Sequence, residues 1–458
     1  MRHKKSVARA ARTGLRWSFH LKPLVGCLGL LALGAWAQNA PSTQSIPSAT
    51  KGSVALAAPS GAAVPVVAEL GADQIIPVIL AHNPQLRAAQ SARQAARSGI
   101  TTAQALANPR IDWHQGRNTA RLPGVTSGST HSWTISQAID NPALRKARID
   151  VASAHEVEST HSVGLTRNEL VSQARLRIYQ GLLSQALAAA AAEDVQLLEQ
   201  VRERVRLRVE SGEAARYEII KADAEIITAR ERLQTARLMV EQRKIQLNQL
   251  AAGQLPEQWQ LLGDLRDAPE LLSLSQLHQL VEKHNPELNL LQAELAKARA
   301  GLRGAESSRW PGVELRYSQS QDPELRHGQW GVGVQIPLLD RRTGPIAQAS
   351  AELERAQIRL EGRKAELQQQ VLLTWKSLEM ARLRIEALSQ GSVREAEAAL
   401  RVAQAAYRFG ERGILDVLDA QRVLRSVRAD LIEARYQLQE ARVTLDQLIG
   451  QNIEQSPS

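Results

Sequence analysis

The sequence of this chain repeats itself after roughly 200 residues, and this duplication limits the possible folds more than any other feature. The segment at 82–86 (HNPQL) recurs at 284–288 as HNPEL. Two further pairs recur 198 residues apart, 212–213 with 410–411 (GE) and 236–237 with 434–435 (AR). The nearly constant offset predicts a tandem duplication, with halves at 71–253 and 274–450, a connector at 254–273 and a tail at 451–458.

The two halves carry the same succession of secondary-structure signals. Each opens with Asn-Pro, a combination that caps and starts a helix, and continues into two segments in which apolar and polar residues alternate as in strands. A long helix, a glycine-containing turn and a returning helix then complete each half. In the first half the helix, strands, long helix and turn are expected at 84–107, about 109–139, 143–210 and 211–215, and in the second half at 286–308, about 312–338, 345–409 and 410–414. The pattern predicts a mainly α fold with a small β part.

The composition agrees with long helices and argues against several other classes of protein. Aromatic residues make up only 3% of the chain, whereas hydrophobic residues reach 43%, with Ala and Leu prominent. The single cysteine excludes a disulfide scaffold and a thiolate metal cluster. The histidines lack the spacing of paired helical ligands, and no constellation of catalytic residues is visible. We therefore expect no metal site, no cofactor and no enzymatic activity.

The positive charge of the chain is concentrated at its N-terminus. The net charge is +10, yet residues 1–37 alone contain seven basic residues and no acidic residue. An apolar run at 24–37 ends in Ala35-Trp36-Ala37, so we expect a secretory signal peptide at 1–37 that is cut after Ala37. A lipobox-like segment leaves open the alternative that Cys27 is lipidated. Residues 38–70 predict a flexible linker, and the charge indicates export rather than nucleic-acid binding.

The short hairpins of each half raise the question of what covers their apolar faces, because isolated hairpins are marginally stable in water. Several chains could pool their strands into one closed barrel in a membrane, with apolar faces toward lipid and polar faces toward a wet lumen. Aromatic side chains in or beside the strands would then lie at the membrane interface. These residues are Trp113, Trp133, Trp310, Tyr317 and Trp330. The alternative is that these rings belong to an ordinary soluble core.

The signal peptide, the duplicated halves, the Asn-Pro openings and the helical turns together resemble the TolC-type outer-membrane factors, over about residues 70–450. The most specific segment is 410–420 (GERGILDVLDA), which resembles the second periplasmic tip of that family. The segment 331–342 (GVGVQIPLLDRR), with Gly344, is similar to the strand-to-helix entry of the CzcC-like, metal-efflux branch. The first-half counterpart at 137–140 departs from this pattern at Ala138.

This resemblance implies a homotrimer in which four strands from each chain form a twelve-stranded transmembrane β-barrel. The duplicated long-helix hairpins would form a periplasmic α-barrel that continues the channel. It also implies a location in the bacterial outer membrane, in contact with outer-membrane lipid. The long periplasmic portion would meet a periplasmic adaptor (a membrane fusion protein) and an inner-membrane pump of the RND class.

The resemblance also implies roles for residues near the two turns. It implies that Asp416 and Asp419 line the periplasmic aperture, where Arg412 helps to hold the pore closed; Glu218 is the first-half counterpart of Asp416. Acids near a helix N-terminus are also favoured by the helix dipole, so a purely structural role for the aspartates stays open. Glycines are likewise needed simply to reverse the chain. The residues expected at the adaptor-facing tips are Gly212, Glu213, Gly410, Glu411 and Gly413.

We therefore expect an outer-membrane channel of a tripartite efflux system that exports divalent metal cations such as cobalt, zinc, cadmium or nickel. A multidrug or type I secretion channel of the same architecture is an alternative within this class. A soluble periplasmic coiled-coil scaffold without a pore is the alternative from a different class.

Overall fold

The computed structural model describes residues 68–119, 121, 123–266, 272–336 and 338–451. The expected signal peptide with its cleavage site Ala37, the alternative lipidation site Cys27, and most of the linker lie outside the described residues. Residues 452–458 of the expected tail also lie outside them.

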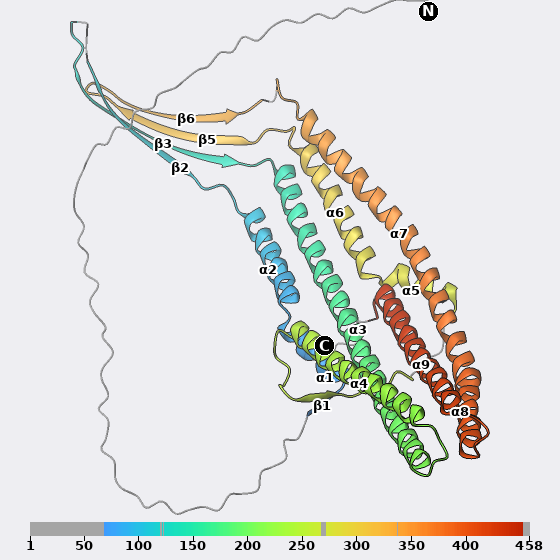
Figure 1. The fold of residues 1–458 in the computed structure, drawn as a ribbon. Helices are drawn as coiled ribbons and strands as arrows, with labels where there is room; N and C mark the ends of the chain where they lie inside the picture. The colour runs from blue at the N-terminus through green and yellow to red at the C-terminus, as the bar shows by residue number, and fades with distance from the viewer. Residues whose placement is uncertain (1–67, 120, 122, 267–271, 337, 452–458) are drawn as a thin grey trace, which may run out of the picture. The chain divides into compact units, whose positions relative to one another are not determined.

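Both halves of the described chain follow one order of elements: a short helix, a second helix, two strands, a long helical stretch and a returning helix (Figure 1). The first half contains α1 (Ala72–His82), α2 (Pro84–Gln104), β2 (Arg110–Asn118), β3 (Gly128–Ile139), α3 (Pro142–Glu210) and α4 (Arg216–Leu250). The second half contains α5 (Leu274–His284), α6 (Pro286–Ser307), β5 (Val313–Gln321), β6 (Arg326–Val334), α7 (Thr343–Glu386), α8 (Val393–Arg408) and α9 (Ile414–Ile449). The predicted mainly α fold with a small β part is confirmed.

Three features of the fold were not expected from the sequence. Ala68–Leu70, which the sequence analysis places in a linker, forms β1 and pairs in parallel with β4 (Trp259–Leu261) in the connector. Short helices α1 and α5 precede the Asn-Pro motifs. A π-helical segment, Ala387–Ser392, joins α7 to α8, whereas the corresponding part of α3 is a continuous α-helix. Strands of three residues and single π-helical turns are too short to leave a periodic pattern in a sequence.

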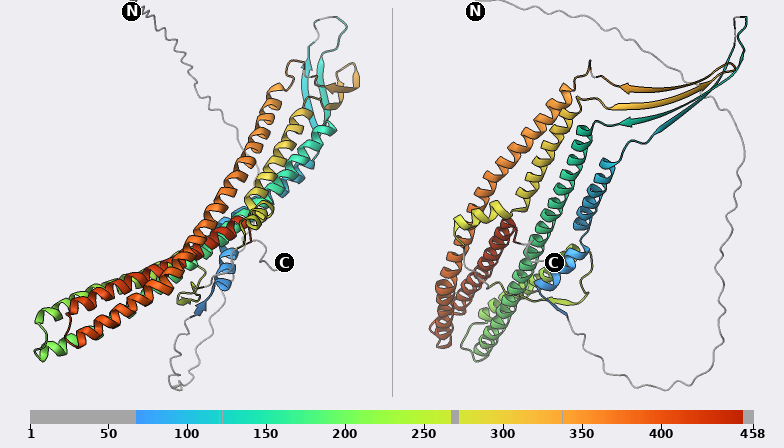
Figure 2. Two further views of the ribbon diagram at one scale, coloured as in Figure 1. Left: turned by 90° about the vertical axis from the view of Figure 1, so that its right-hand side faces the viewer. Right: turned by 180° about the vertical axis from the view of Figure 1, so that it is seen from behind.

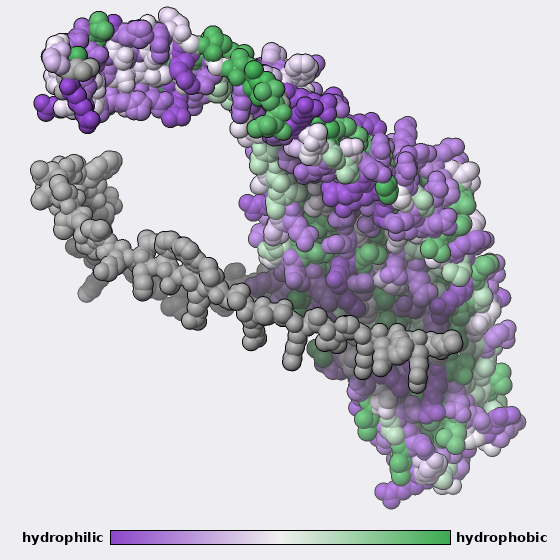
Figure 3. Space-filling model, turned by 90° about the horizontal axis from the view of Figure 1, so that it is seen from above, coloured by the Kyte–Doolittle hydropathy of each residue, from purple (hydrophilic) through white to green (hydrophobic). Residues whose placement is uncertain are grey.

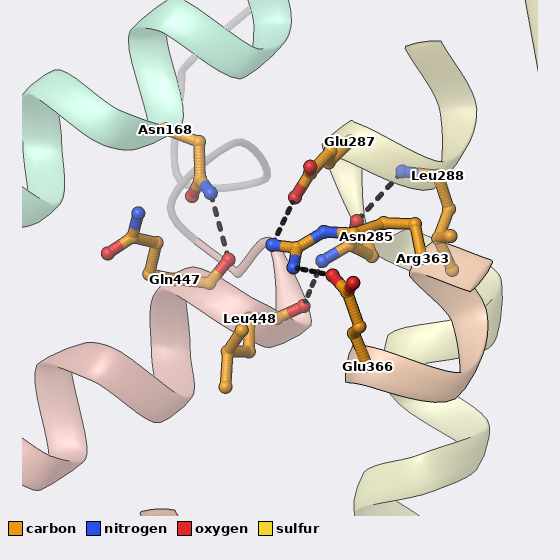
Figure 4. A network of polar contacts seen from close by, with 8 residues as sticks. All are labelled: Asn168, Asn285, Glu287, Leu288, Arg363, Glu366, Gln447 and Leu448. Carbon is orange, nitrogen blue, oxygen red and sulfur yellow. Dashed lines mark hydrogen bonds and ion pairs between the residues drawn. The ribbon is translucent and has the colours of Figure 1, made fainter. Parts of the chain in front are cut away.

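In each half, the repeated Asn-Pro motif connects the start of the second helix to the end of the returning helix. Asn285 caps α6, because its Oδ1 accepts a hydrogen bond from the backbone N–H of Leu288 at 2.8 Å. Its Nδ2 donates to the carbonyl oxygen of Leu448, near the end of α9, at 2.8 Å (Figure 4). In the first half, Asn83 accepts from the N–H of Gln85 at 2.9 Å and donates to the carbonyl of Leu250 at 3.1 Å. We call Asn83 and Asn285, both buried, the asparagine latches.

Further polar contacts surround the second latch. Asn168 of α3 donates to the carbonyl oxygen of Gln447 in α9 at 2.8 Å (Figure 4). Arg363 of α7 bonds the carboxylates of Glu287 at 2.8 Å and Glu366 at 2.9 Å. The carboxyl-terminal end of α9 is thereby connected to α3 and α6, and α6 to α7, at one level of the helical stack.

Three clusters of buried apolar side chains hold the helices together. One surrounds Ile75 and Leu170, where α1, α3, α4 and the connector meet. A second, around Val205 and Val417, joins α3 and α4 to α8 and α9 near the two turns. The third, around Val371, joins α5, α6, α7 and α9. The long helix α3 contacts α2, α4, α6 and α9, and therefore links both halves (Figures 1 and 2).

The four longer strands form one antiparallel sheet in the order β2-β3-β5-β6. Because β3 pairs with β5, the sheet joins the two halves of the duplication. The sheet lies where α2, α3, α6 and α7 begin or end, and the turns after α3 and α8 lie at the other ends of the helices (Figures 1 and 2). Two separate regions, the sheet and the turns, therefore carry the residues predicted to be functional.

Candidate functional site

On all four strands, one face of the sheet is mainly apolar in the part nearer the helices. The register pairs Trp113 with Trp133, Ile135 with Tyr317, and Tyr317 with Trp330, so all of these side chains share a face. Other apolar residues of that face follow at intervals of two along each strand. They are Ile111, Ile139, Val313, Leu315, Val332 and Val334. We call this set the apolar sheet face.

The opposite face of the sheet is polar. It consists mainly of short polar, charged and glycine residues that alternate with the members of the apolar sheet face. These residues include Asp112, His114, Ser132, Thr134, Glu314, Arg316, Ser318, His327 and Gln329. An antiparallel sheet of this kind separates an apolar from an aqueous environment.

The apolar sheet face is exposed in the single chain. Trp330 is 83% exposed and Trp113 is 62% exposed. Trp133 and Trp330 both pack against Tyr317, with ring centroids 5.3 Å and 4.6 Å from its ring. Trp310 differs from the other predicted aromatics, because it lies in the turn between α6 and β5, where it is 70% exposed. Figure 3 shows hydrophobic residues gathered along the part of the sheet next to the helices.

The two turns at the other ends of the helices have matching backbone geometry. Gly212 has a φ of 79° and Gly410 a φ of 75°, a left-handed conformation that L side chains rarely adopt. The next residues, Glu213 and Glu411, donate their backbone N–H groups to carbonyls five residues earlier, as in a helix C-terminal motif. Gly413 is extended and directly precedes α9.

We call α3 with α4, and α8 with α9, the two hairpins. The predicted aperture residues of the second half form ion pairs within the hairpin of α8 and α9. Arg412 lies 3.8 Å from Asp416, and Asp419 accepts a hydrogen bond from Arg422 at 3.1 Å. Arg422 also bonds Glu225 of α4, so it connects the two hairpins. The structure thus places a basic partner beside each of the two aspartates.

Glu218, the predicted first-half aperture residue, contacts the second half instead of standing alone. The hydroxyl of Tyr407 in α8 donates a hydrogen bond to Glu218 at 2.9 Å. Arg208 of α3 donates to the carbonyl oxygen of Tyr407 at 2.6 Å, and its guanidinium lies 4.7 Å from the centre of the tyrosine ring. Burial, together with the neighbouring Glu218 carboxylate, raises the pKa of the Tyr407 phenol to about 12. Tyr407 therefore remains a hydrogen-bond donor at neutral pH.

Sequence reasoning missed both Tyr407 and Arg208. Tyr407 is one of five tyrosines in the chain and stands three residues before Gly410, which was the available signal. Its partner Glu218 is 189 residues away in the sequence, so the contact could not be read from local spacing.

Farther from the turns, buried Asp194 of α3 accepts from Gln421 of α9 at 2.8 Å and lies 3.7 Å from Arg425.

Histidine and acidic side chains are dispersed over the described residues. In those ranges, no group of three or more His, Cys, Asp or Glu side chains is placed to hold a metal ion. None of the helices that the structure describes combines the length and the apolar character needed to cross a membrane.

The family model for outer membrane efflux proteins matches residues 75–253 and 277–451. The chain belongs to the outer membrane efflux protein family. It is 25% identical over 378 residues to the cobalt-zinc-cadmium resistance protein CzcC of Cupriavidus metallidurans, covering 80% of this chain and 87% of CzcC. It is 28% identical over 269 residues to the outer membrane efflux protein BepC of Brucella suis, covering 55% of this chain and 58% of BepC.

A solved outer membrane channel has the same fold. The open state of the MtrE outer membrane channel of Neisseria gonorrhoeae superimposes with a TM-score of 0.70 at 18% sequence identity, covering 83% of this chain and 88% of MtrE. The predicted resemblance to the TolC-type outer-membrane factors and to CzcC is confirmed. The outer membrane efflux proteins are channel proteins rather than enzymes.

Proposed function

We propose that this protein is the homotrimeric outer-membrane channel of a tripartite efflux system. The observation that carries the proposal is the exposed apolar sheet face. Burying one Val, Leu, Ile or Phe side chain contributes about 1.5–3 kcal/mol, so a face of this size requires a cover. Lipid is the cover that suits a sheet whose other face is polar, because a channel lumen is filled with water. The face is longest on β3, where Trp133 to Ile139, with Gln137 between them, spans roughly 20 Å at 3.3 Å per residue.

The edges of the sheet support assembly from several copies. Within the described residues, β2 and β6 each pair with one neighbouring strand, and their outer edges carry unpaired backbone groups. Three sheets joined edge to edge would give a closed barrel of twelve strands and leave no edge exposed. Trp113, Trp133, Tyr317 and Trp330 would then lie toward one membrane interface and Trp310 toward the other, each in contact with outer-membrane lipid.

The helices would continue the channel through the periplasm to an aperture at the turns. We assign Asp416 and Asp419 to the wall of this aperture, where carboxylates from three chains would favour cations over anions. The contact of Tyr407 with Glu218 joins the two hairpins and would hold them in a closed arrangement. Arg412, which pairs with Asp416 inside one hairpin, would fix the position of that carboxylate at the aperture. The turn residues assigned to contact with a periplasmic adaptor are Gly212, Glu213, Gly410, Glu411 and Gly413.

The proposed cargo is a divalent heavy-metal cation of the cobalt, zinc, cadmium or nickel type, delivered by an RND pump through the adaptor. The likeness to CzcC, whose name records cobalt, zinc and cadmium resistance, supports this choice. The names of BepC and MtrE specify no metal, so a multidrug or type I secretion channel of the same architecture is the second candidate.

The proposal is tested by location first and by cargo second. The mature protein should fractionate with the outer membrane and require detergent for release, whereas a protein that stays in the soluble periplasmic fraction would contradict the proposal. Deleting the gene should lower tolerance to zinc, cobalt or cadmium and leave tolerance to organic toxicants unchanged. The reverse pattern would favour the second candidate and overturn the metal assignment.

A further inference from the structure

A pocket of about 270 Å³ lies between the two hairpins, close to the turns. Its wall comes from the end of α3 and the following turn on one side, and from α8 and the start of α9 on the other. The lining residues that matter for its chemistry are three arginines and three apolar side chains. They are Arg204, Arg208, Arg408, Val201, Leu207 and Val417.

The charge of this pocket is strongly positive for its size. Among the described residues, no hydrogen bond or ion pair joins the side chain of Arg204 or Arg408 to another residue, and both residues are exposed. Arg208 is the most enclosed of the three, with 23% of its side chain exposed. The one acidic residue in the wall is Glu213, at 3.6 Å from Arg208. Three guanidinium groups around one carboxylate leave two positive charges uncompensated.

We propose that this arginine pocket binds a carboxylate side chain, a glutamate or aspartate, presented by a helical segment of a periplasmic partner protein. The inference rests on the proposed function, because it assumes that the turns face such a partner. Charge complementarity selects the ligand, since guanidinium groups bind carboxylates through paired, charge-assisted hydrogen bonds. The volume suits one acidic side chain, and Val201, Leu207 and Val417 form an apolar wall for its methylene groups. Two free arginines at the mouth would also attract an acidic segment from a distance.

The position of the pocket connects its occupancy to the contact between the hairpins. Arg208 lines the pocket and also donates to the carbonyl oxygen of Tyr407, whose hydroxyl bonds Glu218. An incoming carboxylate would compete with that carbonyl for Arg208, because a charged acceptor forms the stronger hydrogen bond. Binding of the partner would thereby weaken the Arg208–Tyr407 connection and favour separation of the hairpins.

The binding step can be measured on the purified full-length protein with two synthetic probes. The probes are alanine-rich, stapled helical peptides of identical sequence except for glutamate or glutamine at one central position. We expect the glutamate peptide to bind about tenfold more tightly in fluorescence anisotropy, the difference that one charge-assisted hydrogen bond supplies. The double substitution Arg204→Gln/Arg408→Gln should abolish this difference, and raising the salt concentration should reduce it.

A matched control removes the same number of charges from the same two helices outside the pocket. Arg206 of α3 pairs with Glu203 and Glu210, and Arg394 lies at the start of α8. The Arg206→Gln/Arg394→Gln protein should keep the preference for the glutamate peptide. Equal binding of the two peptides by the wild type, or equal loss in both double variants, would overturn the proposal. So would a change of oligomeric state in Arg204→Gln/Arg408→Gln without a change in peptide binding, because the pocket would then hold a neighbouring copy.

Planar-bilayer recordings separate this inference from the proposed function. The glutamate peptide should raise the conductance of wild-type channels, and the glutamine peptide should not. If the wild-type protein forms no channel, the proposed function fails. If it forms channels that respond alike to both peptides, the channel stands and the coupling of the arginine pocket to opening is wrong.

Discussion

The two halves of the chain preserve one duplicated feature and diverge at another. Both asparagine latches cap the start of one helix, Asn83 through the N–H two residues on and Asn285 through the N–H three residues on, and both donate to a carbonyl at the end of the returning helix. Near the turns, by contrast, α9 carries Asp416 and Asp419 where α4 carries Glu218 and Lys221. Glu218 there accepts a hydrogen bond from the second half. Matching positions therefore have the same role at the asparagine latches, whereas near the turns they differ in charge and in their partners.

The strands show a milder version of the same divergence. Within the apolar sheet face, β6 contributes Trp330, Val332 and Val334, whereas β2 contributes only Ile111 and Trp113. Both sets lie on one face, so a charged substitution in either half should impair membrane assembly, and the two effects should differ in size. Substitutions at matching positions of the two halves therefore separate the roles that the halves share from those that they do not.

Placing a charge on the apolar sheet face should prevent membrane assembly. Val332→Arg puts a guanidinium where we propose lipid, at a cost of about 2–4 kcal/mol per chain near the middle of the bilayer. We expect almost no protein in the outer-membrane fraction and no detergent-resistant oligomer. Ile111→Arg in the first half should act in the same direction.

The control for this prediction lies on the opposite face of the same strand. Gln329→Arg introduces the same side chain among polar residues, and the protein should reach the outer membrane in normal amounts. Equal accumulation of Val332→Arg and Gln329→Arg would show that the apolar sheet face does not contact lipid.

Removing an asparagine latch should destabilise the protein by a similar amount in either half. Asn285→Ala removes a helix cap, worth about 1 kcal/mol. It also leaves the carbonyl of Leu448 without its side-chain donor, which costs about 1–3 kcal/mol for a buried group. Asn83→Ala has the same two consequences at Gln85 and Leu250. Both variants should therefore lower the thermal unfolding temperature measurably, by nearly equal amounts.

Two further variants sharpen this comparison of the halves. Asn285→Asp keeps the acceptor for the Leu288 N–H but loses the donor to Leu448, so it should recover only the capping part of the loss. Gln90→Ala, an exposed substitution in α2, should leave the unfolding temperature unchanged. A large effect of Asn285→Ala with none from Asn83→Ala would mean that the latches are not equivalent.

The sequence was sufficient for features that depend on local periodicity or on one residue type. The alternation of Val313, Leu315 and Tyr317 predicted a strand, and the structure places β5 there. Asn-Pro predicted helix starts at 84 and 286, where α2 and α6 begin. The second contact of each latch could not be predicted from the sequence, since residues such as Asn285 and Leu448 are 163 residues apart.

The residues of the candidate sites could be predicted from the sequence to the same extent as the elements of the fold. Period-two alternation identified the aromatic residues of the strands, because a strand fixes which side chains share a face. The partner of Glu218 could not be identified, because α3, α4, α8 and α9 must pack before Tyr407 approaches it. The roles assigned to the turn and aperture residues stay predictions.

Removing the Tyr407 hydroxyl should weaken the contact between the hairpins without disturbing the core. Tyr407→Phe keeps the buried ring and its contact with Arg208, and deletes a hydrogen bond to a carboxylate worth about 1.5–3 kcal/mol. We expect a several-fold rise in planar-bilayer conductance, because the closed arrangement loses one of its connections. Tyr436→Phe is the matched control: the hydroxyl of buried Tyr436 bonds Glu440 of α9 at 3.1 Å and accepts from Gln180 of α3 at 3.3 Å, farther from the turns. Its substitution should lower stability and leave conductance unchanged, and equal conductance of both variants with the wild type would remove Tyr407 from the gate.

The smallest expected effect concerns ion preference at the aperture, where the halves differ most in charge. Asp416→Ala/Asp419→Ala should reduce the preference for potassium over chloride by roughly two- to threefold, because each carboxylate is already paired with an arginine and screened by salt. Lys221→Ala, at the first-half position that matches Asp419, should shift the preference slightly the other way. Reversal potentials in a salt gradient measure both changes. Asp430→Ala serves as the control, because Asp430 lies farther along α9 and pairs there with Arg384 of α7. An unchanged reversal potential in the double variant would assign Asp416 and Asp419 to stabilising the start of α9 through the helix dipole, and the second half would then carry no special role in selecting ions.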